Sequence, residues 1–158
     1  MKPQKQRKPF VLYILLLLIF FQALSGLSGG TALVFDPTGG FLKMPLSLLD
    51  RSPFENYLIP GLILLILLGL FPSWVFYSLL ARSQRNQLGW LNAYKEQHWS
   101  WTASLYVGVM LVIWMDFEIL WIGHRDLMQT VYALAGVAII IFTLHPAVKK
   151  HYTSIHQS

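Results

Sequence analysis

The chain has no cysteine among its 158 residues and few charged side chains, which make up 12% of the sequence. Without cysteine it forms no disulfide, and it uses neither a thiolate nucleophile nor cysteine-ligated zinc. A glycine-rich phosphate loop, a nucleophile elbow, a zinc-binding HExxH helix and a dinucleotide fingerprint are also missing from the sequence. We therefore assign no catalytic residue, no metal site and no cofactor.

What the sequence does contain is long apolar runs, and 55% of its residues are hydrophobic. Each run is long enough to cross a hydrocarbon layer of about 30 Å. The first run lacks an Ala-x-Ala cleavage site, so we expect it to stay as an uncleaved span. The sequence predicts an all-α membrane protein, a single transmembrane domain over residues 1–158, with spans at about 10–29, 57–80, 100–122 and 127–146, an outer interfacial segment at 31–56 and a cytoplasmic tail at 147–158.

Basic residues predict how the spans are oriented, because loops on the cytoplasmic side are enriched in lysine and arginine. Nine of the 12 basic residues lie on one side of the predicted spans. This distribution predicts an up-down bundle in the cell membrane with both termini in the cytoplasm. Trp99 and Trp101 then mark the inner end of the third span and Trp121 its outer end. The cytoplasmic set is Lys2, Lys5, Arg7, Lys8, Arg82, Arg85, Lys95, Lys149 and Lys150, and the outer set is Lys43, Arg51 and Arg125.

The outer segment is too long and too apolar for a plain linker, so we expect it to have structure of its own. Asp36 and Pro37 occupy positions that favour a type I turn, since proline presets φ and aspartate accepts from the backbone. Pro45 then lies in the first turn of a short helix on the membrane surface.

A helix start is predicted just before the second span. Ser52 and Glu55 have the spacing of a capping box, with Pro53 at the first helical position. Within the span, Pro60 and Pro72 each lack a backbone N–H, so we expect a kink before each of them.

The outer segment contains the motifs Asp36-Pro37-Thr38-Gly39, Met44-Pro45-Leu46, Ser52-Pro53-Phe54 and Tyr57-Leu58-Ile59-Pro60-Gly61. With these motifs it resembles a family of small four-span bacterial membrane proteins that has no assigned activity. The resemblance covers mainly residues 30–70, and Lys43 stands where a glycine is expected. It implies a bacterial inner-membrane location and a four-helix architecture.

Two acidic residues, Asp116 and Glu118, lie within the third span. Burying an ionised carboxylate at this depth costs about 2.5–3.5 kcal/mol on insertion scales, so such a group normally faces the bundle interior or water. Residues two apart on a helix point about 200° away from each other. At most one of the two acids can therefore face the centre of the bundle.

The connection after the third span is short, so the third and fourth spans form an antiparallel hairpin that gathers polar residues at its outer end. One hypothesis is a site that holds a proton, a cation or a ligand amine between two indoles. The other is an interhelical hydrogen bond or ion pair, with Arg125 pairing with Glu118. The candidate residues are Glu118, Asp116, Trp114, Trp121, Gln129, Tyr132 and Arg125; the outer segment adds Asp36, Pro37, Pro45, Ser52 and Glu55.

Smaller patterns complete the sequence-based predictions. Gln22 is a polar residue inside the first span, so we expect it to hydrogen-bond another helix. Small residues four apart, such as Gly26 and Gly30, permit close helix packing. The histidines His145, His151 and His156 do not share a helical face, and we expect them to be solvated in the tail rather than to bind metal.

Three classes of function fit these patterns. The first is non-catalytic binding of a lipid, a small apolar molecule or a protein partner. The second is an oligomeric, proton- or ion-coupled transporter or channel that uses Glu118, and the third is a membrane enzyme acting on a lipid headgroup. We expect membrane lipid as a partner, together with a membrane protein or further copies of the chain, and no nucleic acid, because the basic residues form no stripe. The acids available to an enzyme are Asp36, Asp50, Glu55, Asp116 and Glu118.

Overall fold

The structure, a computed structural model, describes residues 8–81 and 92–153. Within these ranges the chain is helical and contains no β-strand, so the predicted all-α class is confirmed. Four helices are long and apolar enough to cross a membrane, counting Leu58–Ala81 as one. The elements are α1 (Phe10–Phe35), the 3-10 helix η1 (Leu46–Leu49), α2 (Leu58–Leu65), the π-helix η2 (Ile66–Leu70), α3 (Phe71–Ala81), α4 (Trp99–Ile122), α5 (Leu127–Leu144) and α6 (Pro146–Thr153).

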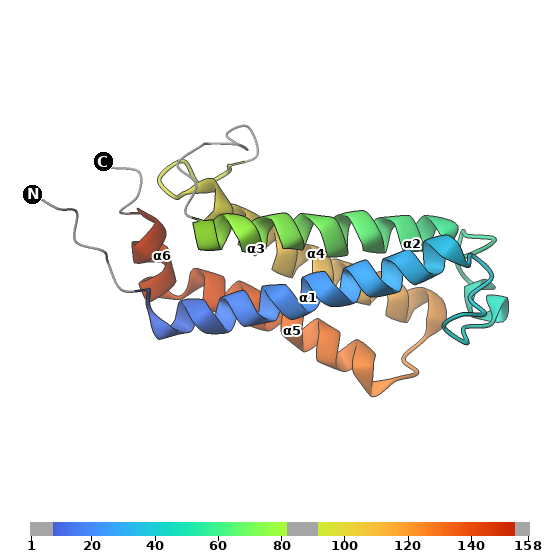
Figure 1. Cartoon of the computed structure of the whole chain (residues 1–158). Helices are drawn as coiled ribbons and strands as arrows, with labels where there is room; N and C mark the ends of the chain where they lie inside the picture. Colours follow the sequence, from blue (N-terminus) through green and yellow to red (C-terminus); the bar gives the residue numbers. More distant parts are fainter. Residues whose placement is uncertain (1–7, 82–91, 154–158) are drawn as a thin grey trace, which may run out of the picture.

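The helices run side by side along one long axis (Figure 1). The start of α1, the end of α3, the start of α4 and all of α6 lie at one end of the molecule, and residues 36–57 lie at the other. Helix α1 packs along α2, η2 and α3, whereas α5 packs mainly on α4. Towards its first residue, α5 diverges from α1.

Two predicted boundaries are wrong. Helix α1 runs to Phe35 rather than to about residue 29, because the first strong helix breaker is Pro37 after Asp36. The outer segment therefore begins at residue 36 rather than 31.

The C-terminal segment is also not a free tail. Residues 146–153 form α6, in which Val148, His151 and Tyr152 are buried. The hydroxyl of Tyr152 donates to the carbonyl of Leu79 at 3.0 Å and so ties α6 to the end of α3. The prediction of solvated tail histidines is wrong for His151, since the amphipathic helix turns this face inward. His156 lies outside the described residues.

Close backbone contact joins α1 to the second span. A Cβ atom on Gly26 would lie 2.0 Å from the carbonyl oxygen of Leu68, and one on Gly30 would lie 2.5 Å from the backbone nitrogen of Leu65. As predicted, these small residues serve packing within the chain, since only a glycine lets two helix backbones approach so closely.

The two prolines of the second span behave differently. Pro60 is the third residue of α2, where a backbone N–H has no acceptor within the helix, so the predicted kink there is wrong. Pro72 follows the π-helix, and its missing N–H leaves the carbonyl of Leu68 without its usual donor. Gln22 donates its amide Nε2 to this carbonyl at 3.3 Å, which confirms the predicted interhelical bond.

The predicted capping box is wrong. Ser52 accepts from the backbone N–H of Phe54 at 3.2 Å in a local turn, and Glu55 is exposed. Helix α2 begins only at Leu58, whose backbone N–H donates a hydrogen bond to the side-chain oxygen of Asn56 at 3.0 Å. The hydroxyl of Ser52 therefore accepts from a residue two positions along the chain rather than three, and such a bond closes a turn instead of starting a helix.

Elsewhere the outer segment follows the predicted turn chemistry. The N–H of Gly39 bonds the carbonyl of Asp36 at 3.0 Å, and Pro45 directly precedes η1. Lys43 has a φ of 55°, the left-handed conformation that a glycine adopts most readily. The tight backbone turn is thus present even though the residue is lysine.

The carboxylate of Asp36 organises this turn and makes it sensitive to acid. Its oxygens accept from the hydroxyl of Thr38 and from the N–H of Phe41 at 2.7 Å, and these bonds hold the pKa of Asp36 below its ordinary 3.8. A lowered folded-state pKa stabilises the turn above the unfolded value, and the stabilisation is lost as pH falls through the folded value. We expect the protection of the Phe41 amide, its exchange rate relative to that of an unstructured amide at the same pH, to be lost below that pH. In Asp36→Asn the exchange should be faster at neutral pH and should lack this acid transition; an unchanged transition would contradict the prediction.

Candidate functional site

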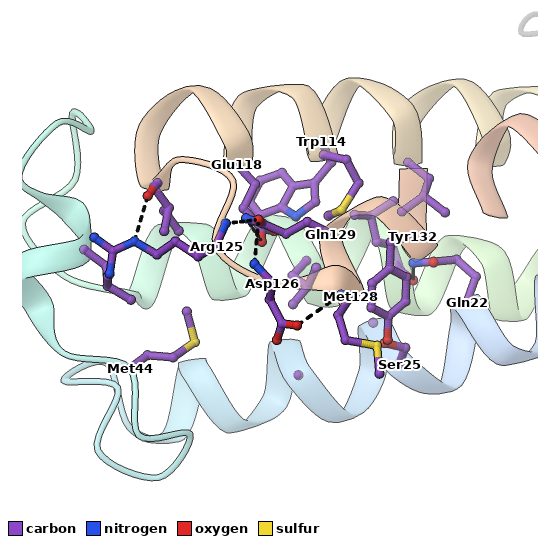
Figure 2. Close-up of a pocket in the computed structure, with 18 residues that line it drawn as sticks. Gln22, Ser25, Met44, Trp114, Glu118, Arg125, Asp126, Met128, Gln129 and Tyr132 are labelled. Carbon is purple, nitrogen blue, oxygen red and sulfur yellow. Dashed lines mark hydrogen bonds between the residues drawn. The ribbon is translucent and has the colours of Figure 1, made fainter. Parts of the chain in front are cut away.

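A cavity of about 370 Å³ lies between the spans beneath the outer segment (Figure 2). Helices α1, α4 and α5 and the second span provide its walls, and Met44 and Leu48 of the outer segment add to the lining. Its polar lining is Gln22, Ser25, Trp114, Glu118, Arg125, Asp126, Gln129 and Tyr132, and the remainder is Gly26, Gly29, Met44, Leu48, Leu64, Leu68, Leu111, Met115, Ile122 and Met128.

Gln129 is the polar centre of the hairpin between α4 and α5. Its Oε1 accepts from the backbone N–H of Arg125 at 2.9 Å, and Asp126 caps α5 in a capping box with Gln129. Its Nε2 donates to Glu118 Oε1 at 3.2 Å and to the carbonyl of Gly123 at 3.3 Å. This is an interhelical hydrogen bond of the kind that one of the two sequence hypotheses predicts. The capping box itself was missed, although Asp126 and Gln129 have its spacing.

The two acids of α4 point in different directions, as their spacing predicts. Glu118 lines the cavity, whereas Asp116 is exposed on the outer surface of α4. The predicted pairing of Glu118 with Arg125 is wrong. Arg125 instead donates its Nε to the carbonyl of Ile122 at 3.1 Å, because it follows the end of α4 and folds back over the last turn.

The predicted indole pair is only partly available to a ligand. Trp114, Glu118 and Trp121 do line a second, smaller pocket of about 180 Å³ together. However, Trp121 stacks on Phe117 with ring centroids 5.3 Å apart and meets Phe54 at 5.2 Å. Phe117 therefore covers one face of the Trp121 indole.

The cavity wall contains two buried polar atoms without a hydrogen bond: Gln22 Oε1 and Trp114 Nε1. Within the described ranges no other buried side-chain nitrogen or oxygen lacks a partner. The indole N–H of Trp114 lies near the Glu118 carboxylate but does not reach hydrogen-bonding geometry. Gln22 is only 4% exposed, and an unsatisfied buried group of this kind costs about 1–3 kcal/mol. A bound molecule or ordered water in the cavity would remove that cost once the Gln22 amide turns towards it, because Oε1 itself has almost no accessible surface.

Tyr132 joins α5 to α1 at the edge of the cavity. Its hydroxyl and that of Ser25 are hydrogen-bonded at 2.5 Å. The hairpin thus brings Gln129 and Tyr132 to the site as predicted, whereas Ser25, Met128, Met44 and Leu48 were missed because no pattern distinguishes them. None of the predicted outer-segment residues Asp36, Pro37, Pro45, Ser52 and Glu55 lines the cavity.

Neither a family model, nor a curated protein, nor a solved structure matches this chain. Within the described ranges no group of three histidine or acidic residues could hold a metal ion. The argument for function therefore depends on the cavity and on the chemistry of its walls.

Proposed function

We propose that this integral membrane protein binds a membrane lipid or a small apolar molecule in the cavity without changing it chemically. The observation that carries this proposal is the cavity itself, whose walls include two buried polar atoms that lack a partner. Ligand pockets of about 300–1,000 Å³ typically combine apolar walls with a few placed polar groups. The volume and the lining of this cavity match that description.

The proposed orientation places the cavity in the outer half of the bilayer. Nine of the 12 basic residues would then face the cytoplasm, as the positive-inside rule requires. We also propose an up-down bundle with both termini in the cytoplasm of a bacterial cell. The outer segment would cover the cavity from outside, since Met44 and Leu48 are part of its lining.

The position of Glu118 favours binding over the alternative of an oligomeric ion pathway. A pore between subunits would require this carboxylate to face a neighbouring chain. Glu118 instead faces the interior cavity and accepts from Gln129 of the same hairpin, whereas Asp116 faces outward. The carboxylate is therefore available to a molecule inside one protomer.

Filling the cavity tests the proposal. Leu64 lines the cavity, while Leu62 on the same helix is exposed to lipid. We expect Leu64→Trp to lower the fraction of protein that carries a non-detergent molecule at least about tenfold, a change of roughly 1.4 kcal/mol. The measurement is native mass spectrometry, on protein purified in mild detergent and on delipidated protein returned to a bacterial polar lipid extract.

Leu62→Trp is the matched control, and we expect it to retain the bound molecule. Equal retention by both variants would show that the bound molecule lies outside the cavity. A wild-type protein that takes up nothing from the extract would overturn the proposed function.

A further inference from the structure

A groove of about 490 Å³ lies on the lipid-facing surface between α1 and α5. Phe21, Leu24 and Met128 line it and are more than half exposed, with exposed fractions of 59%, 53% and 58%. The groove shares Gln22, Ser25, Met128 and Tyr132 with the cavity. The cavity and the groove therefore adjoin at these side chains.

The helices on either side of this groove each pack closely against another helix. Gly26 holds the backbone of α1 against the second span, and a Cβ atom on Gly108 would lie 2.9 Å from the carbonyl oxygen of Gly136, so α4 and α5 are also closely packed. Two tight helix pairs thus meet along the boundary between α1 and α5. The hydrogen bond between Ser25 and Tyr132 crosses this boundary, and breaking it requires no backbone movement.

The polar groups at the inner side of this boundary indicate the chemistry of a ligand. Gln22 Oε1 needs a donor, and Trp114 Nε1 needs an acceptor. The charged groups that line the cavity are Glu118, Asp126 and Arg125, which together carry more negative than positive charge. An anionic headgroup is therefore disfavoured beside the Glu118 carboxylate, whereas a neutral group with hydroxyl and carbonyl oxygens can satisfy both unpartnered atoms.

We propose that the ligand is a neutral, single-chain lipid with a free hydroxyl group, such as a monoacylglycerol, which passes from the membrane into the cavity through the groove between α1 and α5. This inference rests on the proposed function and specifies its ligand class and route. The Gln22 amide and the Trp114 indole turn towards the cavity, because their unpartnered atoms have almost no accessible surface. The hydroxyl then donates to Gln22 Oε1, an ester oxygen accepts from Trp114, and the acyl chain follows the groove towards the lipid. Ser25 and Tyr132 separate to admit the chain.

The first test compares three lipids with the same oleoyl chain on delipidated wild-type protein. Monoolein has hydroxyl donors and an ester, methyl oleate has the ester but no donor, and oleate is an anion. In native mass spectrometry titrations we expect monoolein to bind at least about fivefold more tightly than methyl oleate, because methyl oleate leaves Gln22 unsatisfied. In Gln22→Leu the difference should disappear. Equal binding of monoolein and methyl oleate to wild type, or tighter binding of oleate, would overturn the ligand class while leaving the proposed function intact.

The second test addresses the route and does not depend on folding of the Gln22 variant. Val131 lines the groove, whereas Val137 is an exposed residue of the same helix outside it. We expect Val131→Trp to slow monoolein association at least about tenfold and Val137→Trp to leave it unchanged, since only the former obstructs the groove. Equal association rates for the two variants would overturn the route. Binding of none of the three lipids to a wild-type protein that does take up a molecule from the lipid extract would overturn the ligand class, whereas uptake of nothing from either would overturn the proposed function itself.

Discussion

Gly26→Ala lowers the free energy of unfolding by about 3 kcal/mol or more, the upper part of the range for overpacked cores. The new Cβ atom would lie 2.0 Å from the carbonyl oxygen of Leu68 and 2.6 Å from the backbone nitrogen of Gly69. Both are main-chain atoms, so α1 and the second span must separate along their length. The separation also lengthens the bond from Gln22 to the Leu68 carbonyl. Equilibrium unfolding in mixed detergent micelles, titrated with a denaturing detergent, measures the change.

Gly29→Ala is the matched control one turn from Gly26. Its Cβ atom would lie 3.2 Å from Leu64 Cδ2, the far end of a flexible side chain. A shift of a few tenths of an ångström relieves this contact, so we expect a loss below about 1 kcal/mol. Equal losses for Gly26→Ala and Gly29→Ala would refute the close backbone approach of α1 to the second span.

Gln129→Leu is the second change with a large expected effect, about 3 kcal/mol of lost unfolding free energy. The substitution removes the bonds that Gln129 Oε1 accepts in the capping box and the two bonds donated by Nε2, while Asp126 still caps α5. Loss of the Oε1 half of the capping box alone costs about 1 kcal/mol. The larger part arises because the Glu118 carboxylate, which accepts its interhelical bond from Gln129, stays in the bundle without that donor.

A double-mutant cycle separates these contributions. If the unpaired carboxylate is the main cost, adding Glu118→Leu to Gln129→Leu should restore about half of the lost stability, because both partners are then apolar. The bonds accepted by Gln129 Oε1 remain absent in the double variant and account for the rest. A double variant no more stable than Gln129→Leu alone would show that the Glu118 hydrogen bond contributes nothing to stability.

Much of the helical framework could be predicted because it depends on local sequence. Spans are recognised from the length of an uninterrupted run of apolar residues. The hydrogen bond from Gln22 to another helix could be predicted because an amide side chain without a partner is costly in lipid. The errors arose where two local signals competed. Ser52 had the spacing of a cap but closed a turn, and Pro60 lay so close to the start of α2 that its missing N–H had no effect.

The site was less predictable because it combines residues from separate helices. Glu118, Gln129 and Tyr132 could be proposed since a short hairpin constrains their relative positions. Ser25 and Met44 could not, because the packing of α1 and of the outer segment against that hairpin involves contacts far apart in the chain. The wrong pairing of Arg125 with Glu118 has the same origin, since the direction of the arginine side chain depends on how α4 ends.

The amino-acid sequence by itself determined that this protein lies in lipid and that it has four apolar helices. It also determined that Asp116 and Glu118 cannot both face the interior of the bundle. These properties depend on hydropathy and on helical periodicity, which act within a single segment. Tertiary structure alone decided that Glu118 is the inward acid, that α1 and α5 meet loosely, and that Gln22 and Trp114 leave polar atoms unpaired beside one cavity. The physical reason is that apolar spans of similar hydropathy can pack in many arrangements, and close contacts such as Gly26 on Leu68 select one of them.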